Sequence, residues 1–475
     1  MIRRLRPTAA VIGALVLAGC TSLPPAAAVP TAMAAHEVCS AMFVSDLDGK
    51  RAFADTVAPQ LGPAARLVRV QADPTRKTVT AALAGLYARR ATYREPYGCV
   101  VGDEASNLPV VDKAGGPPPP TQESSVVRTR DTELTSALDI AFSESSDGPR
   151  RRTYAAVIVH DGRIVAERYA PGVGVDTPLH GWSMGKSVTN ALLGVLVKQG
   201  RLDMFAPAPV PEWRDPADAR HSITPDDLLR MRSGLDVGQS LIPRWNAPFD
   251  PANRIMFASP DMGAAAARRA LKSPVRSAWT YSDGNTAVLG RLIRQTAGGG
   301  DPAATQSFAR RELFERLGMG SVTIETDATG SPVGATQVYA SARDWARLGQ
   351  LYLDDGVAGG QRIFPAGWVE YSTTLTPGSN PYGYGAGFWV TSGSDDHGLP
   401  VGSFLARGAR GQYVIVVPSA RLVVAKLGDA DAPRGDFEAM VGLVGALTKW
   451  ANSTGRRDAG LSLSQAPNPA SRPRQ

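Results

Sequence analysis

A serine and a lysine three positions apart give this chain the means for nucleophilic chemistry. Ser183 and Lys186 stand in the stretch HGWSMGK, and apolar residues then recur at the spacing of one helical face. A helix that starts here places the lysine one turn beyond the serine, within reach of its hydroxyl group. A serine is a weak nucleophile until a base takes its proton. We therefore expect Ser183 to be the nucleophile and Lys186 its partner, with a lysine pKa lowered by burial or by a nearby cation. The simpler alternative is an N-cap serine beside a solvated lysine.

A second stretch, WTYSDGN at 279–285, precedes another apolar run with helical spacing. Together the two stretches resemble the serine β-lactamase and penicillin-binding superfamily, in particular its class C-like branch. That branch also holds carboxylesterases, D-aminopeptidases and aminohexanoate-dimer hydrolases. Its Tyr-x-Asn motif corresponds here to Tyr281-Ser282-Asp283. The resemblance implies that Tyr281 shares proton transfer with Lys186, which requires cations that lower the phenol pKa from about 10. Otherwise Tyr281 is a packed aromatic residue at a helix entry.

Asp283 departs from the asparagine that is usual in this family. A carboxylate at this position adds negative charge and disfavours anionic substrates and a neighbouring phenolate. The substitution therefore argues against hydrolysis of β-lactams.

The third motif of the family, Lys-Thr-Gly or His-x-Gly, lies on a strand at the edge of the site. The best register here is Ala406-Arg407-Gly408, without lysine or histidine in first place. The resemblance implies that Gly408 lets the strand approach the substrate, and that the N–H groups of Ala409 and Ser183 bind the oxyanion. Arg407 or Arg410 either supplies the missing positive charge or is a plain surface residue. This departure is more similar to the aminohexanoate-dimer hydrolases and esterases than to antibiotic-resistance enzymes.

The elements that position these groups form one domain at 126–452, with predicted strands at its two ends and helices between. Asp161-Gly162 joins two β-rich runs at 154–169, and a second hairpin is expected at 412–427. Because this is not a regular βαβ alternation, we expect an α+β, β-lactamase/transpeptidase-like fold. Its antiparallel sheet is flanked by helices and carries an inserted helical region. Helices are expected at 132–145, 224–232, 285–296, 342–353 and 436–451.

The first nineteen residues have the pattern of an export signal. A basic start and a short apolar stretch end in Leu17-Ala18-Gly19-Cys20, which resembles the lipobox of bacterial lipoproteins. The resemblance implies a signal peptide at 1–19, lipidation of Cys20 and a membrane-anchored protein on the periplasmic or outer-surface side of the cell envelope. The alternative is an ordinary signal peptide with a chance cysteine.

Residues 20–125 read as an accessory segment. Residues 20–35, rich in Ala, Pro and Thr, are expected to form a tether, 36–105 a small extension, and the Gly-Pro run at 115–120 a stiff linker. Once Cys20 carries lipid, Cys39 and Cys99 remain as an even pair, either disulfide-bonded or as two buried thiols. A polar tail at 453–475 is expected to be disordered.

Composition limits the function further. The 475 residues carry a formal charge of +7, or +4 without the three leader arginines, and no long basic run, so nucleic acid is not an expected partner. None of the five histidines forms a ligand pair with the cysteines, and no phosphate-binding glycine loop or dinucleotide motif occurs, so we expect neither metal nor cofactor. The chain also lacks a Gly-x-Ser-x-Gly elbow around Ser183.

The sequence thus predicts a serine hydrolase that cleaves a small ester, amide or peptide substrate through an acyl-serine intermediate. The alternative is a cell-wall-binding lipoprotein on the same fold with a degraded site.

Overall fold

The computed structural model describes residues 23–103, 107–109, 125–144, 150–240, 249–391, 398–431 and 436–464, with side chains from 28 to 454. The expected signal peptide, Cys20 and the linker at 115–120 lie outside the described residues. Within the described ranges, no helix is both long and apolar enough to cross a bilayer.

A six-stranded antiparallel sheet forms the centre of the domain expected at 126–452, which we refer to as the catalytic domain because it contains Ser183 and Lys186. Strands from both ends of the domain meet in its middle, where Leu422 of β15 pairs with His160 of β5. This confirms the predicted α+β class and the antiparallel sheet. In sheet order the strands are β12 (Trp389–Val390), β13 (Phe404–Gly408), β14 (Gln412–Val417), β15 (Leu422–Gly428), β5 (Thr153–His160) and β6 (Arg163–Tyr169).

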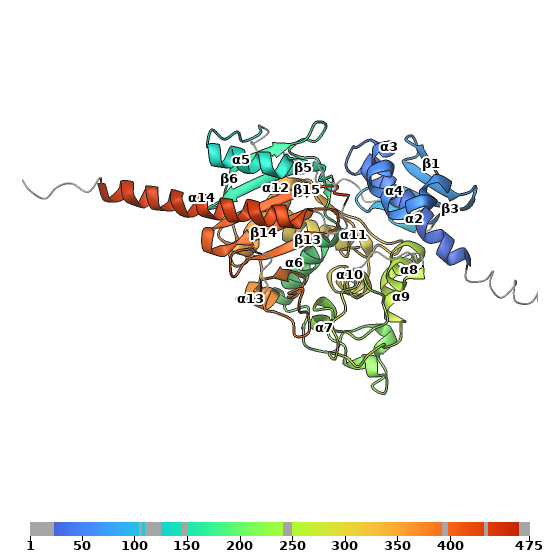
Figure 1. Cartoon of the computed structure of the whole chain (residues 1–475). Coiled ribbons are helices and arrows are strands. Elements are labelled where there is room, and N and C mark those ends of the chain that lie inside the picture. Colours follow the sequence, from blue (N-terminus) through green and yellow to red (C-terminus); the bar gives the residue numbers. More distant parts are fainter. Residues whose placement is uncertain are drawn as a thin grey trace, which may run out of the picture.

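Both faces of the sheet are covered, because its central strands are apolar at nearly every position and must be buried on both sides. Helices α5 (Thr132–Phe142) and α14 (Phe437–Ser464) pack on one face (Figure 1). Helix α12 (Ala342–Leu353) packs on the other face, together with the helical region.

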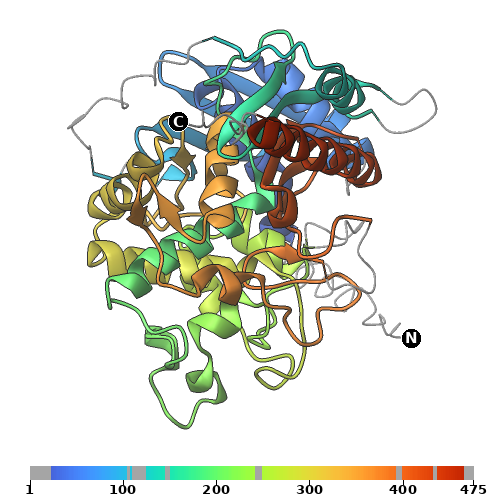
Figure 2. The same ribbon diagram turned by 90° about the vertical axis from the view of Figure 1, so that its left-hand side faces the viewer.

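The inserted helical region lies between the two groups of strands in sequence, as predicted. Its helices, coloured green to yellow, gather on the lower side of the molecule in Figure 2. At its centre α6 (Gly185–Lys198) packs against α10 (Asp283–Gly298), both with apolar faces in the main core. Around them lie α7 (Pro225–Leu229), α8 (Pro251–Ala258), α9 (Met262–Ala267), α11 (Pro302–Ala309), α13 (Trp368–Thr373) and the small sheet of β7 (Leu179–His180), β9 (Val338–Ala340) and β8 (Thr323–Ile324).

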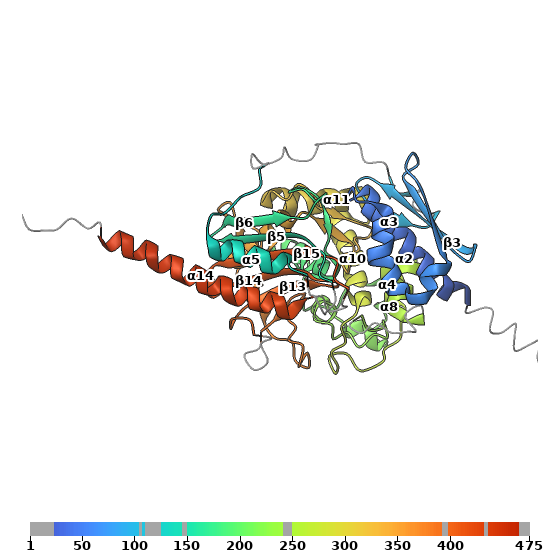
Figure 3. The same cartoon turned by 45° about the horizontal axis from the view of Figure 1, so that its top comes forward.

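The predicted tether at 20–35 is wrong for its described part, because these residues belong to helix α2 (Leu23–Phe43). The helix packs between a four-stranded sheet and α8 of the catalytic domain (Figure 3). Ala28, Ala32 and Ala35 are buried there, so alanines that resemble a linker by composition provide a closely packing helix face. The sheet consists of β1 (Val68–Asp73), β2 (Thr78–Leu83), β3 (Leu86–Arg94) and β4 (Gly98–Val101).

Cys39 of α2 and Cys99 of β4 are joined in a disulfide, which is the first of the two alternatives for this pair. The bond ties the helix to the edge strand of its sheet. We refer to α2, the four strands and the helical turns between them, residues 23–103, as the N-terminal unit.

The expected disordered tail is also wrong in its first part, because α14 continues to Ser464 and projects from the body of the protein (Figure 1). The polar residues after Trp450 have modest helix propensity. Extending an existing helix adds one hydrogen bond for each residue fixed, without the cost of a new nucleus. Residues 465–475 lie outside the described residues.

Candidate active site

Ser183 lies in a tight turn that leads directly into α6. The turn is a single 3-10 helix, Trp182–Met184, and Gly185 continues it as the α-helix. Trp182 has a left-handed backbone with φ of 49°, an uncommon conformation for a bulky residue and one often found at functional sites. We refer to residues 181–184 as the nucleophile turn.

Lys186 is buried one turn further on and its amine makes three polar contacts. Its Nζ lies 3.3 Å from Ser183 Oγ, 2.6 Å from Asp283 Oδ1 and 2.9 Å from the carbonyl oxygen of Ala335. The alternative of a solvated lysine is therefore wrong, since the side chain is about 1% exposed.

The charge state of Lys186 differs from the expectation. Burial alone would lower the pKa of Lys186, but the Asp283 carboxylate and the Tyr281 hydroxyl outweigh it and raise the pKa above its ordinary value. The resting site therefore holds an ammonium ion paired with a carboxylate rather than a free amine.

Asp283 is presented to the lysine by the first turn of α10. Ser282 caps this helix: its Oγ accepts the N–H of Gly284 and donates to the carbonyl of Val237. The N–H of Asp283 donates to Ser240 Oγ at 3.1 Å. The positive end of the helix dipole favours a carboxylate here. The residue that departs from the family motif is thus firmly placed against the lysine.

Tyr281, two positions before Asp283, also faces Lys186. The Nζ of Lys186 lies 4.7 Å from the centre of the tyrosine ring. The ring is buried and packs against Tyr384 at 5.5 Å and Trp389 at 5.1 Å between ring centres. Trp279 completes this aromatic wall. Sequence reasoning did not identify the wall, because its members come from stretches about a hundred residues apart.

The predicted third motif lies against the nucleophile turn. Gly408 is the last residue of β13, and a Cβ on it would lie 2.2 Å from the carbonyl oxygen of Gly181. Only glycine therefore fits at this crossing of strand and turn. Ala409 follows in the β13–β14 turn, where its carbonyl accepts the side-chain N–H of Gln412. An oxyanion contact by the N–H of Ala409 stays a prediction.

The two arginines of this motif have structural contacts. Arg407 lies over the ring of Phe437 at 4.5 Å. Arg410 is buried, forms an ion pair with Asp429 and donates to the backbone carbonyl of Asp55 in the N-terminal unit. Arg410 is thus not a surface residue, and it holds the β13–β14 turn against residues before the catalytic domain.

Across the described ranges, no group of three or more His, Cys, Asp or Glu side chains is arranged to hold a metal ion.

A six-stranded antiparallel sheet with helices on both faces, and a serine–lysine pair at the start of a buried helix, define the β-lactamase/transpeptidase-like fold class. The beta-lactamase family matches residues 138–447, well over half of the sequence, and the chain belongs to this family.

One curated enzyme and two solved structures illustrate what this chain is similar to. The 6-aminohexanoate-dimer hydrolase of Paenarthrobacter ureafaciens is 25% identical over 301 residues, which cover 58% of this chain and 72% of that enzyme. A penicillin-binding protein homologue from Caulobacter crescentus has a TM-score of 0.53 at 18% identity, covering 68% of this chain and 99% of its own. A family VIII carboxylesterase has a TM-score of 0.52 at 15% identity, covering 68% and 98%. At these identities the two structures show the shared fold alone.

Proposed function

We propose that the protein is a serine hydrolase that transfers the acyl group of an ester or amide to water through an acyl-Ser183 intermediate. The observation that carries the proposal is the position of the buried Lys186 amine, in contact with both Ser183 Oγ and the Asp283 carboxylate. Gly408 brings a strand edge against the same turn, where backbone N–H groups of Ser183 and Ala409 would bind the oxyanion.

The proton must first leave Lys186, because an ammonium ion accepts none. Lys186 therefore acts in the fraction of the enzyme that has released this proton to solvent, and the pKa that Asp283 raises sets that fraction. The free amine takes the proton of Ser183 as Oγ attacks the carbonyl carbon. Lys186 returns that proton to the leaving alcohol or amine. Tyr281, which faces the same amine, is the second proton carrier.

Deacylation uses the same groups in reverse. Water enters the place of the leaving group and gives its proton to the Lys186 amine as its oxygen attacks the acyl carbon. The bond to Ser183 Oγ breaks, Oγ takes that proton back from Lys186, and a carboxylic acid is released.

The aromatic wall is the basis for proposing small substrates with an apolar acyl or alkyl part. The Tyr281 ring packs beside the Lys186 amine and against Trp389, so the reactive groups have apolar surroundings, and the Lys186–Asp283 pair has no net charge. Esters and linear amides fit this environment better than anionic β-lactams, whose carboxylate would lie near Asp283.

For the location, we propose a lipid anchor at Cys20 and a site in the cell envelope. The disulfide of the N-terminal unit supports an oxidising compartment. Because α2 begins at Leu23, such an anchor would hold the N-terminal unit close to the membrane surface.

The test is hydrolysis of p-nitrophenyl butyrate and of a matching anilide by the purified protein without its leader. We expect Ser183→Ala to abolish turnover, by at least about a thousandfold. Ser277→Ala, at an exposed serine, is the control and should retain full activity. Equal rates for wild type and Ser183→Ala would rule out the mechanism. A wild-type protein with no turnover would favour the cell-wall-binding alternative.

A further inference from the structure

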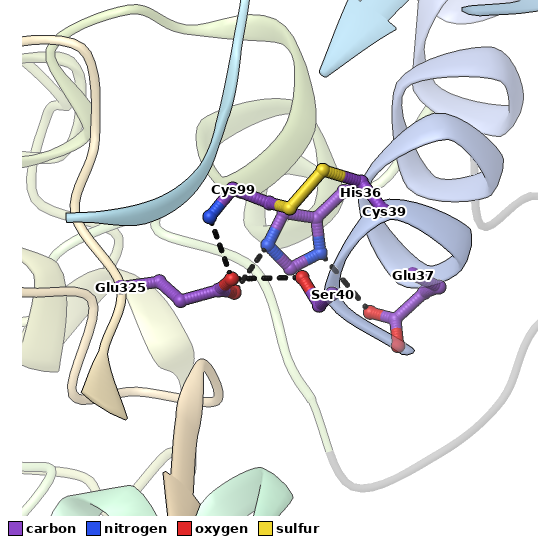
Figure 4. The surroundings of a disulfide bond; sticks show 6 residues. All are labelled: His36, Glu37, Cys39, Ser40, Cys99 and Glu325. Atoms are coloured by element: carbon purple, nitrogen blue, oxygen red, sulfur yellow. Dashed lines mark hydrogen bonds and ion pairs between the residues drawn. A yellow bond between two sulfur atoms is a disulfide. The ribbon is translucent and has the colours of Figure 1, made fainter. Parts of the chain in front are cut away.

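A buried carboxylate of the catalytic domain contacts residues on both sides of the Cys39–Cys99 disulfide. Glu325, directly after β8, is fully buried. Its Oε1 accepts the backbone N–H of Cys99 and the hydroxyl of Ser40, each at 2.8 Å, and its Oε2 lies 2.7 Å from His36 Nε2 (Figure 4). A Cβ on Gly98 would lie 2.4 Å from Glu325 Cγ, so the edge strand β4 also fits closely around this side chain.

His36 stands between this carboxylate and a second one. Its Nδ1 lies 3.4 Å from Oε1 of Glu37, on the side of the ring opposite to Glu325 (Figure 4). Burial alone would lower the pKa of His36, but Glu325 and Glu37 outweigh it and raise the pKa to about 10. His36 is therefore a buried cation shared by one carboxylate from each unit.

The chain of contacts continues from Glu37 into the active site. Its other oxygen, Oε2, lies 3.3 Å from Nδ1 of His180, whose Nε2 lies 2.7 Å from the carbonyl oxygen of Thr336. Both ring nitrogens of His180 are thus held, which fixes the plane of the ring.

His180 is stacked between two aromatic rings. Tyr339 lies at 4.5 Å and Trp182 at 4.3 Å between ring centres, with interplanar angles of 18° and 21°. Trp182 is the residue with the left-handed backbone immediately before Ser183. A conformation of this kind persists only where its surroundings hold it. The stacked rings of His180 and Trp182 therefore join this chain of polar contacts to the nucleophile turn.

We propose that the N-terminal unit helps to position the nucleophile of the active site. His36, Glu37 and His180 are positioning residues. Through Trp182 they hold Ser183 in the geometry for attack. The inference rests on the proposed function, because it assigns these residues to the nucleophile of that reaction. None of the three contacts the reacting atoms. They act through the backbone of the nucleophile turn, where a displacement of about 1 Å is enough to cost about a hundredfold in rate.

The experiment compares the rate at which a fluorophosphonate labels Ser183, and kcat and KM for an ester, in five proteins: the wild type, three single variants and the double variant of Glu37→Gln with His180→Phe. Glu37→Gln retains the size of the side chain and removes its charge. His180→Phe retains the stack on Trp182 and Tyr339 and removes the hydrogen bonds. Glu133→Gln, at an exposed glutamate on α5, is the control for loss of a carboxylate.

We expect Glu37→Gln and His180→Phe to lower kcat and the labelling rate about tenfold or more, with KM within about twofold, because the turn and not the substrate pocket is affected. The double variant should be no slower than the slower single variant, since both act through one chain of contacts. Glu133→Gln should match the wild type.

Wild-type labelling rates in folded Glu37→Gln and His180→Phe would overturn the inference and leave the proposed function intact. If the wild type itself shows no labelling at Ser183, the proposed function fails instead. Should Glu37→Gln not fold, His180→Phe decides the question, because it leaves the His36 cation between its two carboxylates.

Discussion

The Nζ of Lys186 lies 2.6 Å from Oδ1 of Asp283 and 3.3 Å from Oγ of Ser183. The amine expected to activate the serine is thus held more closely by a carboxylate than by the hydroxyl group. Asp283, which departs from the family motif, therefore determines when the lysine can act as a base.

The first prediction concerns this pair. Lys186 accepts a proton only as a free amine, so the pKa that Asp283 raises governs the low-pH side of the kcat/KM profile. Asp283→Asn removes the carboxylate and lowers that pKa. The low-pH limb should therefore move to lower pH, with higher activity at neutral pH than in the wild type.

Asp139→Asn, at an exposed aspartate on α5, is the matched control and should leave the profile unchanged. A limb of the Asp283→Asn profile that stays in place, or moves to higher pH, would show that Lys186 is not the base.

The second prediction tests the crossing of strand and turn. Gly408→Ala places a methyl group 2.2 Å from the carbonyl oxygen of Gly181, so strand and nucleophile turn must separate. We expect kcat to fall about a hundredfold, as for a misplacement of about 1 Å. Gly445→Ala, where a Cβ on α14 meets open space, should retain full activity. Similar kcat values for both variants would show that Gly408 does not contribute to the geometry of the active site.

The third prediction is a pH dependence of stability. A histidine whose pKa is raised on folding stabilises the protein fully below its ordinary value of 6.5, and this contribution is lost as the pH rises to about 10. The free energy of unfolding of the wild type should therefore decrease between these pH values.

The free energy of unfolding is measured by urea titration across this pH range. It should depend less on pH in His36→Gln than in the wild type. His221→Gln should show the same pH dependence as the wild type. Parallel curves for wild type and His36→Gln would mean that His36 is not charged in the folded protein.

The fourth prediction concerns the disulfide. Replacing Cys39 and Cys99 together by serine removes a cross-link that spans 60 residues, and it should lower the free energy of unfolding by about 2–5 kcal/mol. Because the same segment carries Ser40 and the Cys99 N–H that hold Glu325, labelling of Ser183 should also become slower. Unchanged stability in urea would show that the N-terminal unit is held by other contacts.

Local patterns in the sequence were sufficient to predict the antiparallel sheet, the inserted helices and the residues around Ser183. Ser183 and Lys186 are one helical turn apart, and Tyr281 and Asp283 begin the next buried helix, so each pair is positioned by its own helix start. The direction of the lysine pKa was wrong, because it depends on how closely α10 approaches α6. Sequence spacing does not contain that distance.

The N-terminal unit was the least predictable part. Residues 23–35 have the composition of a linker but belong to a helix, and the sheet and α8 packed around it explain why most side chains from 28 to 35 are buried. Glu325 and His180 carry no local signal either. His180 lies three residues before Ser183, but the contact that holds its ring comes from Glu37, more than a hundred residues away in the sequence.

Covalent labelling provides the most direct test of the central claim. The purified protein, treated with a fluorophosphonate and digested, should give one modified peptide with the label on Ser183. Labelling should be absent in Ser183→Ala and strongly reduced in Lys186→Ala. An unlabelled wild-type protein, or a label on another residue, would contradict the account.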